Sequence, residues 1–457
     1  MTSNKERTTI KVQSERAVLA AVRLPESNYD PANPFGELRA LAEQAGAEVV
    51  GELEQRRERP EAGMFMGRGK VDELRGLCET VDARTIIFDH DLSPRQISNI
   101  EEVTKRKVID RSELILDIFA SRATTHEAKL QVELAQLEYT YPRLKSMWTH
   151  LERLGGGGIG TRGPGEQQLE VDRRLVQARK IDLQRELSDI QGRKRREVRK
   201  RKADHVTVGL VGYTNAGKST LFNTLTSGGA YADDRVFATL VTRTREWDLG
   251  GGLNVMLSDT VGFVRDLPHN LIASFRATLE EATHADLLLI VLDASDPASE
   301  LQYRTVMSTL DDLFAETARI EKDAGESWTE PRRVLLLNKA DRLRDNAAVL
   351  EWQGRSPGAI PVSALPGPDG RMLRGQDALE AIVREEARGL VREVRVRLAL
   401  SEAKAIHVIE NRGEVLDRQY DTTHVVLHAK IGNRQLDQLR AAGARMEITP
   451  VGPSAPA

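Results

Sequence analysis

The sequence predicts a multidomain α/β protein, in which a domain with a doubly wound parallel sheet follows a small α/β domain and a helical coiled-coil hairpin and precedes a small α+β domain. Three observations support this prediction. The chain has 457 residues, too many for a single hydrophobic core. Short apolar runs alternate with helical stretches in two separate regions, and a leucine-rich stretch between these regions is interrupted by glycines.

These patterns also set the expected domain boundaries. The boundaries are a flexible tail over residues 1–15, the first α/β domain over 16–122, the hairpin over 123–204 with its glycine-rich tip at 154–166, the doubly wound domain over 205–390, the small α+β domain over 391–450 and a tail over 451–457.

Alternation of strands and helices predicts a small parallel sheet in the first domain. Its predicted strands are Val18–Val22, Glu48–Gly51, Thr85–Phe88 and Lys107–Ile109, and its predicted helices are Pro34–Gln44, Val71–Glu79, Pro94–Thr104 and Ser112–Ser121. The last domain has predicted strands Val394–Leu400, His424–Ala429 and Met446–Thr449 and a predicted helix Asn433–Ala442.

The hairpin is predicted from two stretches of apolar residues at coiled-coil spacing. They are Leu130, Leu134, Leu137, Tyr141, Leu144, Trp148 and Leu151, followed by Leu169, Val176, Leu183, Leu187 and Ile190. The intervening run from Gly155 to Gly165 is too rich in glycine and proline to be helical. We therefore expect two antiparallel helices with an aliphatic seam and a mobile tip.

The run Gly212–Ser219 matches the pattern G-x-x-x-x-G-K-[ST] and lies between an apolar run and a helical stretch. In this pattern backbone N–H groups surround a phosphate, the lysine neutralises the β/γ oxygens, and the hydroxyl binds Mg²⁺. We therefore assign Lys218 to the phosphates and Ser219 to the metal. The candidate contact residues are Gly212, Tyr213, Thr214, Asn215, Ala216, Gly217, Lys218, Ser219 and Thr220.

Two later segments are placed to read the γ-phosphate. Asp259 can hold Mg²⁺ through water, and Gly262 lets the backbone approach the phosphate. Thr239 is expected to bring a second hydroxyl to the metal, so Ser219 and Thr239 are the predicted metal ligands. Lys218, Thr239, Asp259 and Gly262 are the predicted catalytic residues. The contact residues are Phe237, Ala238, Thr239, Leu240 and Val241, then Asp259, Thr260, Val261 and Gly262.

Two further segments are suited to selecting guanine. Asp341 can accept hydrogen bonds from the N1–H and the exocyclic amine of guanine, which adenine cannot offer in this arrangement. Loss of such paired bonds costs on the order of 10⁴-fold in discrimination. Ser363 and Ala364 are expected to place backbone donors near the guanine oxygen. The contact residues are Asn338, Lys339, Ala340, Asp341, Ser363, Ala364 and Leu365. The five elements in this order predict a P-loop GTPase domain with GTP as its substrate.

The group that orients the attacking water is not identified by the sequence. Phe263 follows Gly262, where many such proteins have a glutamine, and a phenyl ring cannot orient water. Two interpretations stay open: a slow or inactive hydrolase, or a hydrolase in which another group or a partner supplies the orientation. Asn215 is a candidate helper, because some P-loop GTPases with asparagine here bind K⁺ as an activator.

Composition excludes several classes of protein. The net charge of −3 gives no overall attraction to nucleic acid. The single cysteine, Cys78, excludes an internal disulfide framework and fits a reducing compartment. No apolar run approaches the roughly 20 residues of a membrane-spanning helix. We therefore expect a cytoplasmic protein without membrane insertion, and peripheral membrane association is left open.

Three remaining features have both functional and structural interpretations. Residues 193–202 contain eight Lys or Arg and one Glu, a local charge of +7, which suits RNA phosphates or a solvated helix face. Arg162 in the glycine-rich tip suits RNA or a plain linker. Gly67–Lys70 loosely resembles a second phosphate loop, but Val71 offers no hydroxyl to Mg²⁺, and a glycine-rich helix start explains the run equally well.

Together these residues resemble the HflX family of bacterial translational GTPases. The resemblance extends from about residue 17 to 390, and its most specific part is Gly163–Arg174. It is also carried by Asp110–Ala120, Gln131–Leu137, Tyr141–Leu144, Phe237–Leu240 and Asp259–Phe263. Val241 and Thr242 replace the family's usual Asp-Pro after the switch leucine.

The resemblance implies a Mg²⁺-dependent GTPase that binds the large (50S) ribosomal subunit and its rRNA and acts in ribosome splitting, rescue or recycling under stress. It also implies slow basal hydrolysis that the ribosome stimulates. The short connection within the hairpin favours a monomer. Two alternatives stay open: an ATP-dependent RNA-remodelling enzyme that works through the N-terminal domain, and a GTP-gated adaptor for non-ribosomal partners.

Overall fold

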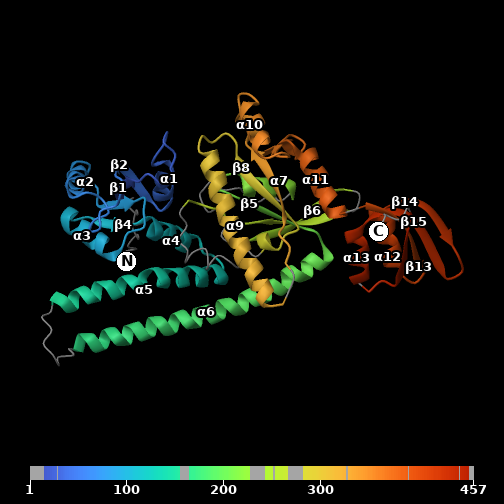
Figure 1. The fold of residues 1–457 in the computed structure, drawn as a ribbon, viewed down its shortest axis with the longest axis horizontal. Coiled ribbons are helices and arrows are strands. Elements are labelled where there is room, and N and C mark those ends of the chain that lie inside the picture. Colours follow the sequence, from blue (N-terminus) through green and yellow to red (C-terminus); the bar gives the residue numbers. More distant parts are fainter. Residues whose placement is uncertain are drawn as a thin grey trace, which may run out of the picture. The chain divides into compact units, whose positions relative to one another are not determined.

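The computed structural model describes most of the chain (Figure 1). The described residues are 15–27, 29–154, 164–226, 242–250, 253–265, 281–325, 328–389, 391–441 and 443–451. They form two compact units that divide within the second long helix, between Leu187 and Ser188. Among the described helices, none combines the length and the hydropathy needed to cross a membrane.

The N-terminal sheet has four parallel strands in the order β2-β1-β3-β4. The strands are β1 (Glu15–Arg23), β2 (Ala47–Arg56), β3 (Thr85–Phe88) and β4 (Lys107–Ile109). The helices are α1 (Gly36–Gln44), α2 (Arg68–Thr80), α3 (Pro94–Thr104) and α4 (Arg111–Arg122). Every strand and helix predicted here is confirmed, with shifts of a few residues at some ends. Because β1 is central and buried on both faces, its sequence reads as a continuous apolar run.

A buried charge cluster lies where β1, β3 and β4 end, and sequence reasoning missed it. Asp89 accepts hydrogen bonds from Arg23 Nη1 at 2.8 Å and from Arg111 Nη1 at 2.7 Å. Arg111 Nη2 also donates to Glu37 Oε1 at 2.6 Å. All three of Arg23, Asp89 and Arg111 are almost fully buried, and buried charges require such pairing. The cluster ties helices α1 and α4 to the sheet.

The two long helices are α5 (His126–Leu154) and α6 (Pro164–Asp204). Glu133 Oε1 lies 2.8 Å from Arg179 Nε, and Glu138 Oε1 lies 2.9 Å from Lys180 Nζ. His126 also pairs with Glu186, so positions early in α5 face positions late in the paired part of α6. The helices are therefore antiparallel, as predicted. The described part of the apolar seam includes the buried side chains Leu130, Leu134, Leu183 and Leu187, and residues 155–163 lie outside the described residues.

A six-stranded sheet forms the centre of the next region, in the order β10-β9-β8-β5-β7-β6. The strands are β5 (Thr207–Gly212), β6 (Arg243–Asp248), β7 (Asn254–Asp259), β8 (Leu287–Asp293), β9 (Arg332–Asn338) and β10 (Ile360–Pro361). Only the edge strand β6 is antiparallel to its neighbour. Figure 1 shows this sheet among α7 (Lys218–Leu225), α9 (Ser299–Asp323), α10 (Ala347–Arg355) and α11 (Gln376–Arg388). This is the P-loop GTPase fold.

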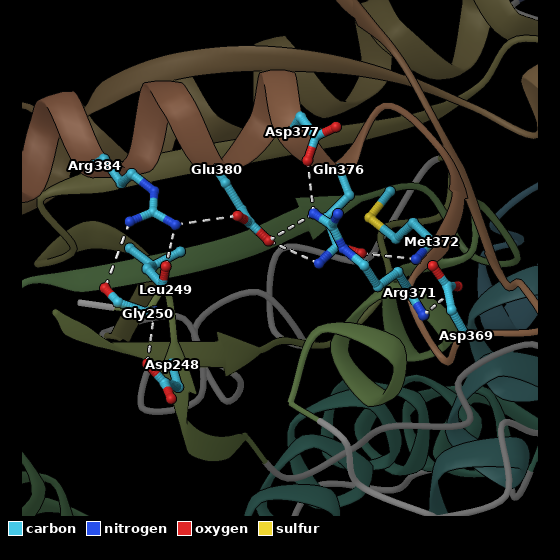
Figure 2. Close-up of polar contacts among 10 residues, drawn as sticks. All are labelled: Asp248, Leu249, Gly250, Asp369, Arg371, Met372, Gln376, Asp377, Glu380 and Arg384. Carbon is cyan, nitrogen blue, oxygen red and sulfur yellow. Dashed lines mark hydrogen bonds and ion pairs between the residues drawn. The ribbon is translucent and has the colours of Figure 1, made fainter. Parts of the chain in front are cut away.

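Side chains of α11 hold the turn between β6 and β7 (Figure 2). Arg384 donates hydrogen bonds to the carbonyl oxygens of Leu249 and Gly250. Glu380 Oε2 lies 3.3 Å from Arg384 Nη2, and its Oε1 lies 3.4 Å from Arg371 Nη2. Arg371 follows the short strand β11 (Ser363–Pro366) and directly precedes β12 (Met372–Arg374). Glu380 therefore links two arginines that fasten two different turns to one helix.

The C-terminal region is a four-stranded antiparallel sheet in the order β14-β15-β13-β16. The predicted elements correspond to β13 (Val391–Ala399), β15 (His424–Gly432), α13 (Asn433–Ala441) and β16 (Met446–Pro450). Two elements of this region were not predicted, α12 (Ala403–Arg412) and β14 (Glu414–Tyr420). Most of β14 is exposed, so it lacks the alternation of apolar and polar residues from which a half-buried strand is recognised.

Candidate nucleotide-binding site

The segment between β5 and α7 forms a tight turn at the carboxyl end of a central strand. β5 ends at Gly212, and α7 begins at Lys218 with Gly217 as its N-cap residue. Gly217 has a φ of +96°, and a Cβ atom there would lie 2.2 Å from Asn338 Nδ2. Asn215 also has a left-handed backbone, with φ 61°, which is uncommon for a residue with a side chain. A turn of this kind before a helix N-terminus binds phosphate groups.

Lys218 folds back over this turn. Its Nζ donates hydrogen bonds to the carbonyl oxygen of Gly212 at 3.1 Å and to that of Tyr213 at 2.8 Å. Burial lowers the pKa of Lys218 to about 8, and the nearby Asp259 carboxylate partly offsets this change. Because burial disfavours an ammonium group without enough negative charge beside it, a phosphate fits this position electrostatically.

Ser219 and Asp259 come together at the end of β7. Ser219 Oγ donates a hydrogen bond to Asp259 Oδ2 at 2.8 Å, and Asp259 is fully buried. A hydroxyl and a carboxylate are hard oxygen donors, which Mg²⁺ binds together with phosphate oxygens and water. These residues therefore fit the ion. Among the described residues, no group of three or more His, Cys, Asp or Glu is placed to hold a metal.

The predicted segment Phe237, Ala238, Thr239, Leu240 and Val241 lies outside the described residues. The second hydroxyl expected at the metal, that of Thr239, therefore stays a prediction.

The chain after β7 lies against the predicted phosphate-binding turn, Gly212–Lys218. Phe263 N donates to the Gly212 carbonyl at 3.1 Å, and Thr214 N donates to the Phe263 carbonyl at 2.8 Å. A Cβ atom at Gly262 would lie 2.8 Å from Thr214 Cγ2 and 3.0 Å from Lys218 Nζ, so this close approach requires glycine. The Phe263 ring is only 2% exposed. Phe263 thus provides packing and a backbone anchor, and its side chain offers no polar group to a water molecule.

The neighbouring predicted residues support this arrangement from the protein interior. Thr260 Oγ1 donates to the Leu210 carbonyl at 2.6 Å, and Val261 is buried. Tyr213 is also buried, and its hydroxyl accepts a hydrogen bond from Arg265 N at 2.9 Å. These hydrogen bonds link the carboxyl end of β5 to the chain that follows β7.

Asn338 connects the phosphate-binding turn to the segment predicted to contact guanine. Its Nδ2 donates to the Ala216 carbonyl at 2.7 Å, and its Oδ1 accepts from Ala364 N at 3.0 Å. The Ala364 N–H, predicted to lie near the guanine oxygen, donates to Asn338 Oδ1 in this structure. The reason is geometric: the carboxyl ends of β9 and β10 are adjacent, so the Asn338 amide reaches both segments.

Asp341 lies in a short 3₁₀ turn, Ala340–Arg342, immediately after the left-handed residue Lys339. Ser363 Oγ donates to Asp341 Oδ1 at 2.6 Å, which fixes the orientation of the carboxylate. Ala340 is buried, and Leu365 is 48% exposed. The structure thus brings the predicted residues of both segments together beside the phosphate-binding turn.

Two residues of this site were missed by sequence reasoning. Asp293, at the end of β8, lies 2.7 Å from Lys339 Nζ through its Oδ2. The Thr224 hydroxyl, on α7, lies 2.8 Å from the Ala364 carbonyl and 3.0 Å from the Thr220 carbonyl. A polar residue at the carboxyl end of a buried parallel strand was an available signal for Asp293. No comparable signal marks Thr224.

The other candidate features have simpler surroundings. Gly67 is the N-cap residue of α2, and its N–H donates to Gln55 Oε1 at 2.8 Å. Lys70 Nζ pairs with Glu73 at 2.8 Å. The basic run 193–202 lies on α6, and Arg162 lies outside the described residues. The described contacts of Gly67–Lys70 are those of an ordinary helix start.

Comparison with known protein families divides the chain into three matched regions. Residues 33–120 match a family described as the GTP-binding GTPase N-terminal region, and residues 122–202 match the GTP-binding GTPase middle region. Residues 207–339 match a family described as 50S ribosome-binding GTPase.

Curated relatives match over most of the chain. A protein of Lacrimispora saccharolytica named GTPase HflX is 40% identical over 425 residues, which is 92% of this chain and 95% of the relative. The GTPase HflX of Escherichia coli K12 is 46% identical over 310 residues, 68% of this chain and 70% of the relative. A solved GTP-binding protein of Sulfolobus solfataricus in complex with GDP is 25% identical, with a TM-score of 0.39, and the alignment covers 82% of this chain and 98% of that one.

Proposed function

We propose that this chain, which belongs to the HflX family of GTPases and hydrolyses GTP, acts as a Mg²⁺-dependent switch on the large (50S) ribosomal subunit. Its GTP-bound form would bind the subunit during splitting, rescue or recycling of ribosomes under stress, and hydrolysis would release it. The switch would use the order-to-disorder changes that γ-phosphate contacts produce in other GTPases.

The observation that carries this proposal is the joining of a GTPase domain to an arm of two long antiparallel helices. Helix α6 contains 41 residues and carries the basic run 193–202 near its end. Lysine and arginine side chains on one helix neutralise RNA phosphates and release counterions. The 50S ribosome-binding description of the family matched by residues 207–339 supports the same partner.

The residues of the site would divide the work of binding and hydrolysis. Lys218 and the N–H groups of the surrounding turn would hold the phosphates, while Ser219 and Asp259 would hold Mg²⁺, directly and through water. The ion would neutralise charge that develops on the phosphate oxygens. Asp341 would accept hydrogen bonds from guanine, with Asn338 keeping the base segment and the phosphate segment in register.

The burial of Phe263 supports slow basal hydrolysis that a partner stimulates. Its ring faces the protein interior, so the water-orienting group must come from elsewhere. Asn215, held in a left-handed conformation in the phosphate-binding turn, is the candidate ligand for an activating K⁺. Hydrolysis should therefore be several-fold faster in KCl than in NaCl at equal ionic strength. Equal rates in the two salts would eliminate the K⁺ hypothesis and leave the ribosomal partner as the remaining source.

Co-sedimentation with purified 50S subunits tests the proposal. The full chain with a non-hydrolysable GTP analogue should pellet with the subunits at physiological salt, and the chain with GDP should remain largely in the supernatant. Replacing the lysines and arginines of 193–202 by glutamine should weaken the association and reduce its salt dependence. Absence of association in either nucleotide state would contradict the proposal and favour the adaptor for non-ribosomal partners.

A further inference from the structure

The segment proposed to contact guanine, Asn338–Asp341, forms an ion pair with Asp293, a residue outside the predicted motifs. Asp293 ends β8, beside Asn338 in the register of the β8–β9 pair. Its Oδ2 lies 2.7 Å from Lys339 Nζ. Its Oδ1 accepts hydrogen bonds from Ser295 N at 3.0 Å and from Ser295 Oγ at 2.6 Å. Both oxygens are therefore engaged, and the direction of the carboxylate is fixed.

Lys339 needs such an anchor because its backbone is strained. It has φ 58° and ψ 31°, the left-handed conformation that side chains other than glycine rarely adopt. Lys339 lies between Asn338, which donates to the Ala216 carbonyl of the phosphate-binding turn, and the 3₁₀ turn that contains Asp341. Its left-handed backbone changes the direction of the chain between these two residues. If Lys339 relaxed toward an ordinary conformation, Asp341 would move away from its present position.

The ion pair is well placed to hold this conformation. The side chains of Lys339 and Asp293 are 18% and 11% exposed, so water screens the pair less than it screens a surface pair. The structure also shows a direct link from Ser363 to Asp341. That bond holds one oxygen of the Asp341 carboxylate, whereas Asp293 contacts the side chain of Lys339, two residues earlier in the chain.

We propose that Asp293 is a positioning residue for guanine recognition: it holds Lys339 in the left-handed turn and thereby aims Asp341 at the base. This inference rests on the proposed role of Asp341 as a guanine acceptor. Asp293 itself does not touch the base, and its effect is transmitted through Lys339.

The test compares GDP with inosine 5′-diphosphate, IDP, whose base lacks the exocyclic amine. Binding of both to the full chain is measured by isothermal titration calorimetry. The wild-type chain should prefer GDP, because Asp341 makes two hydrogen bonds to guanine and one to hypoxanthine. In Asp293→Asn, GDP affinity should fall about tenfold and IDP affinity should fall less, so the GDP/IDP preference shrinks. A merely structural role would lower both affinities equally.

Asp296→Asn is the matched control. Asp296 lies in the same turn but bonds to Ala298 N at 2.8 Å and to Gln302 Nε2 at 2.8 Å, so the GDP/IDP preference should not change. Lys339→Met removes the same ion pair by changing its more exposed partner. This variant therefore still tests the ion pair if Asp293→Asn fails to fold. The double variant should show no greater loss of preference than Lys339→Met alone, since Asp293 acts only through Lys339.

The outcomes separate this inference from the proposal on which it rests. If the wild-type chain binds GDP and IDP equally, the role of Asp341 as guanine acceptor fails, and the inference fails with it. If the wild-type chain discriminates but Asp293→Asn and Lys339→Met keep its preference, only the role of Asp293 is overturned. A double variant that loses more preference than Lys339→Met alone would also overturn it.

Discussion

The chain contains two glycine-lysine turns, Gly212–Lys218 and Gly67–Lys70, whose lysines differ in burial and in hydrogen-bond partners. Lys218 is the first residue of its helix, is buried, and donates to two carbonyl oxygens of its own turn. Lys70 is the third residue of its helix and pairs with Glu73 at the surface. Helical side chains tilt toward the helix N-terminus. A lysine at the first position therefore reaches the preceding turn, where phosphate is proposed to bind, whereas a lysine at the third position can pair with a side chain three residues later.

The comparison is most strongly tested by removing each lysine. Lys218→Ala should weaken GDP and GTP binding by about a hundredfold or more and abolish hydrolysis, because charge-assisted hydrogen bonds to phosphate are worth about 1.5–3 kcal/mol each. Lys70→Ala should leave nucleotide binding unchanged and alter stability by no more than about 0.5 kcal/mol. Fluorescent-nucleotide titration measures nucleotide binding by the two variants, phosphate release measures hydrolysis, and urea denaturation measures stability. Loss of ATP binding in Lys70→Ala would contradict the comparison and revive an N-terminal nucleotide site.

The second test adds a methyl group at the helix cap of the phosphate-binding turn. Gly217→Ala should destabilise the GTPase domain by at least about 2 kcal/mol and abolish nucleotide binding. The new Cβ atom would collide with the Asn338 amide, and the left-handed backbone costs roughly 1–2 kcal/mol for a side-chain-bearing residue. Urea denaturation with and without GDP measures both effects. Unchanged GDP affinity would show that the turn is more adaptable than its geometry indicates.

The single cysteine reports on the helix that follows the second turn. Cys78 lies on α2 and is buried, and burial raises the pKa of its thiol from 9.0 to about 11. The thiolate is the reactive form, so iodoacetamide at pH 8 should label the folded protein about a hundredfold more slowly than the unfolded chain. ATP and GTP should not change the rate. Protection by ATP alone would indicate that a nucleotide binds near this helix.

The same pKa sets a direction for pH dependence. Because the unfolded chain loses the Cys78 proton first, the contribution of the neutral thiol to stability is fully present below pH 9 and is lost as the pH rises toward 11. Cys78→Ala should remove this part of the alkaline destabilisation, which urea denaturation at pH 8 and pH 10 would show. An identical pH dependence in the variant would assign the loss to other groups.

The smallest expected effect is at the glycine of the second turn. Gly69 lies in the first turn of α2, and a Cβ atom there would have no neighbour within 4 Å. Gly69→Ala should therefore stabilise the N-terminal region by about 0.5 kcal/mol, since alanine is the better helix former. Labelling of Cys78 as the temperature rises measures the unfolding of the N-terminal region that contains α2. Destabilisation would mean that Gly69 has a role its surroundings do not show.

Much of the fold was predictable because local pattern and burial agree. β3 and β4 match their predicted bounds, since buried residues of parallel strands read as short apolar runs. Helix α3 also matches: Ser93 and Gln96 form a capping box, and Pro94 begins the helix. β14 and α12 were missed, since a mostly exposed strand and a short helix have weak periodicity.

The site shows where sequence reasoning ends. Fixed-spacing motifs predicted the phosphate-binding turn, Asp259, Asn338 and Asp341, because each of these roles needs a particular residue type at one position. The contacts of Asp293 with Lys339 and of Thr224 with Ala364 join residues separated by 46 and 140 positions of sequence. Such contacts depend on the order of strands in the sheet, which local periodicity does not specify. The buried Arg23–Asp89–Arg111 cluster was missed for the same reason.

The grip of Arg384 on the β6–β7 turn has a mechanical consequence. The hairpin is fixed at the end remote from Asp259, by bonds to two consecutive carbonyl groups. A slip of β6 by one residue along β7 would break these bonds and turn Trp247, which is 1% exposed, out of the core. We therefore expect a displacement of Asp259 to move the chain that follows β7, while the turn bound by Arg384 stays in place.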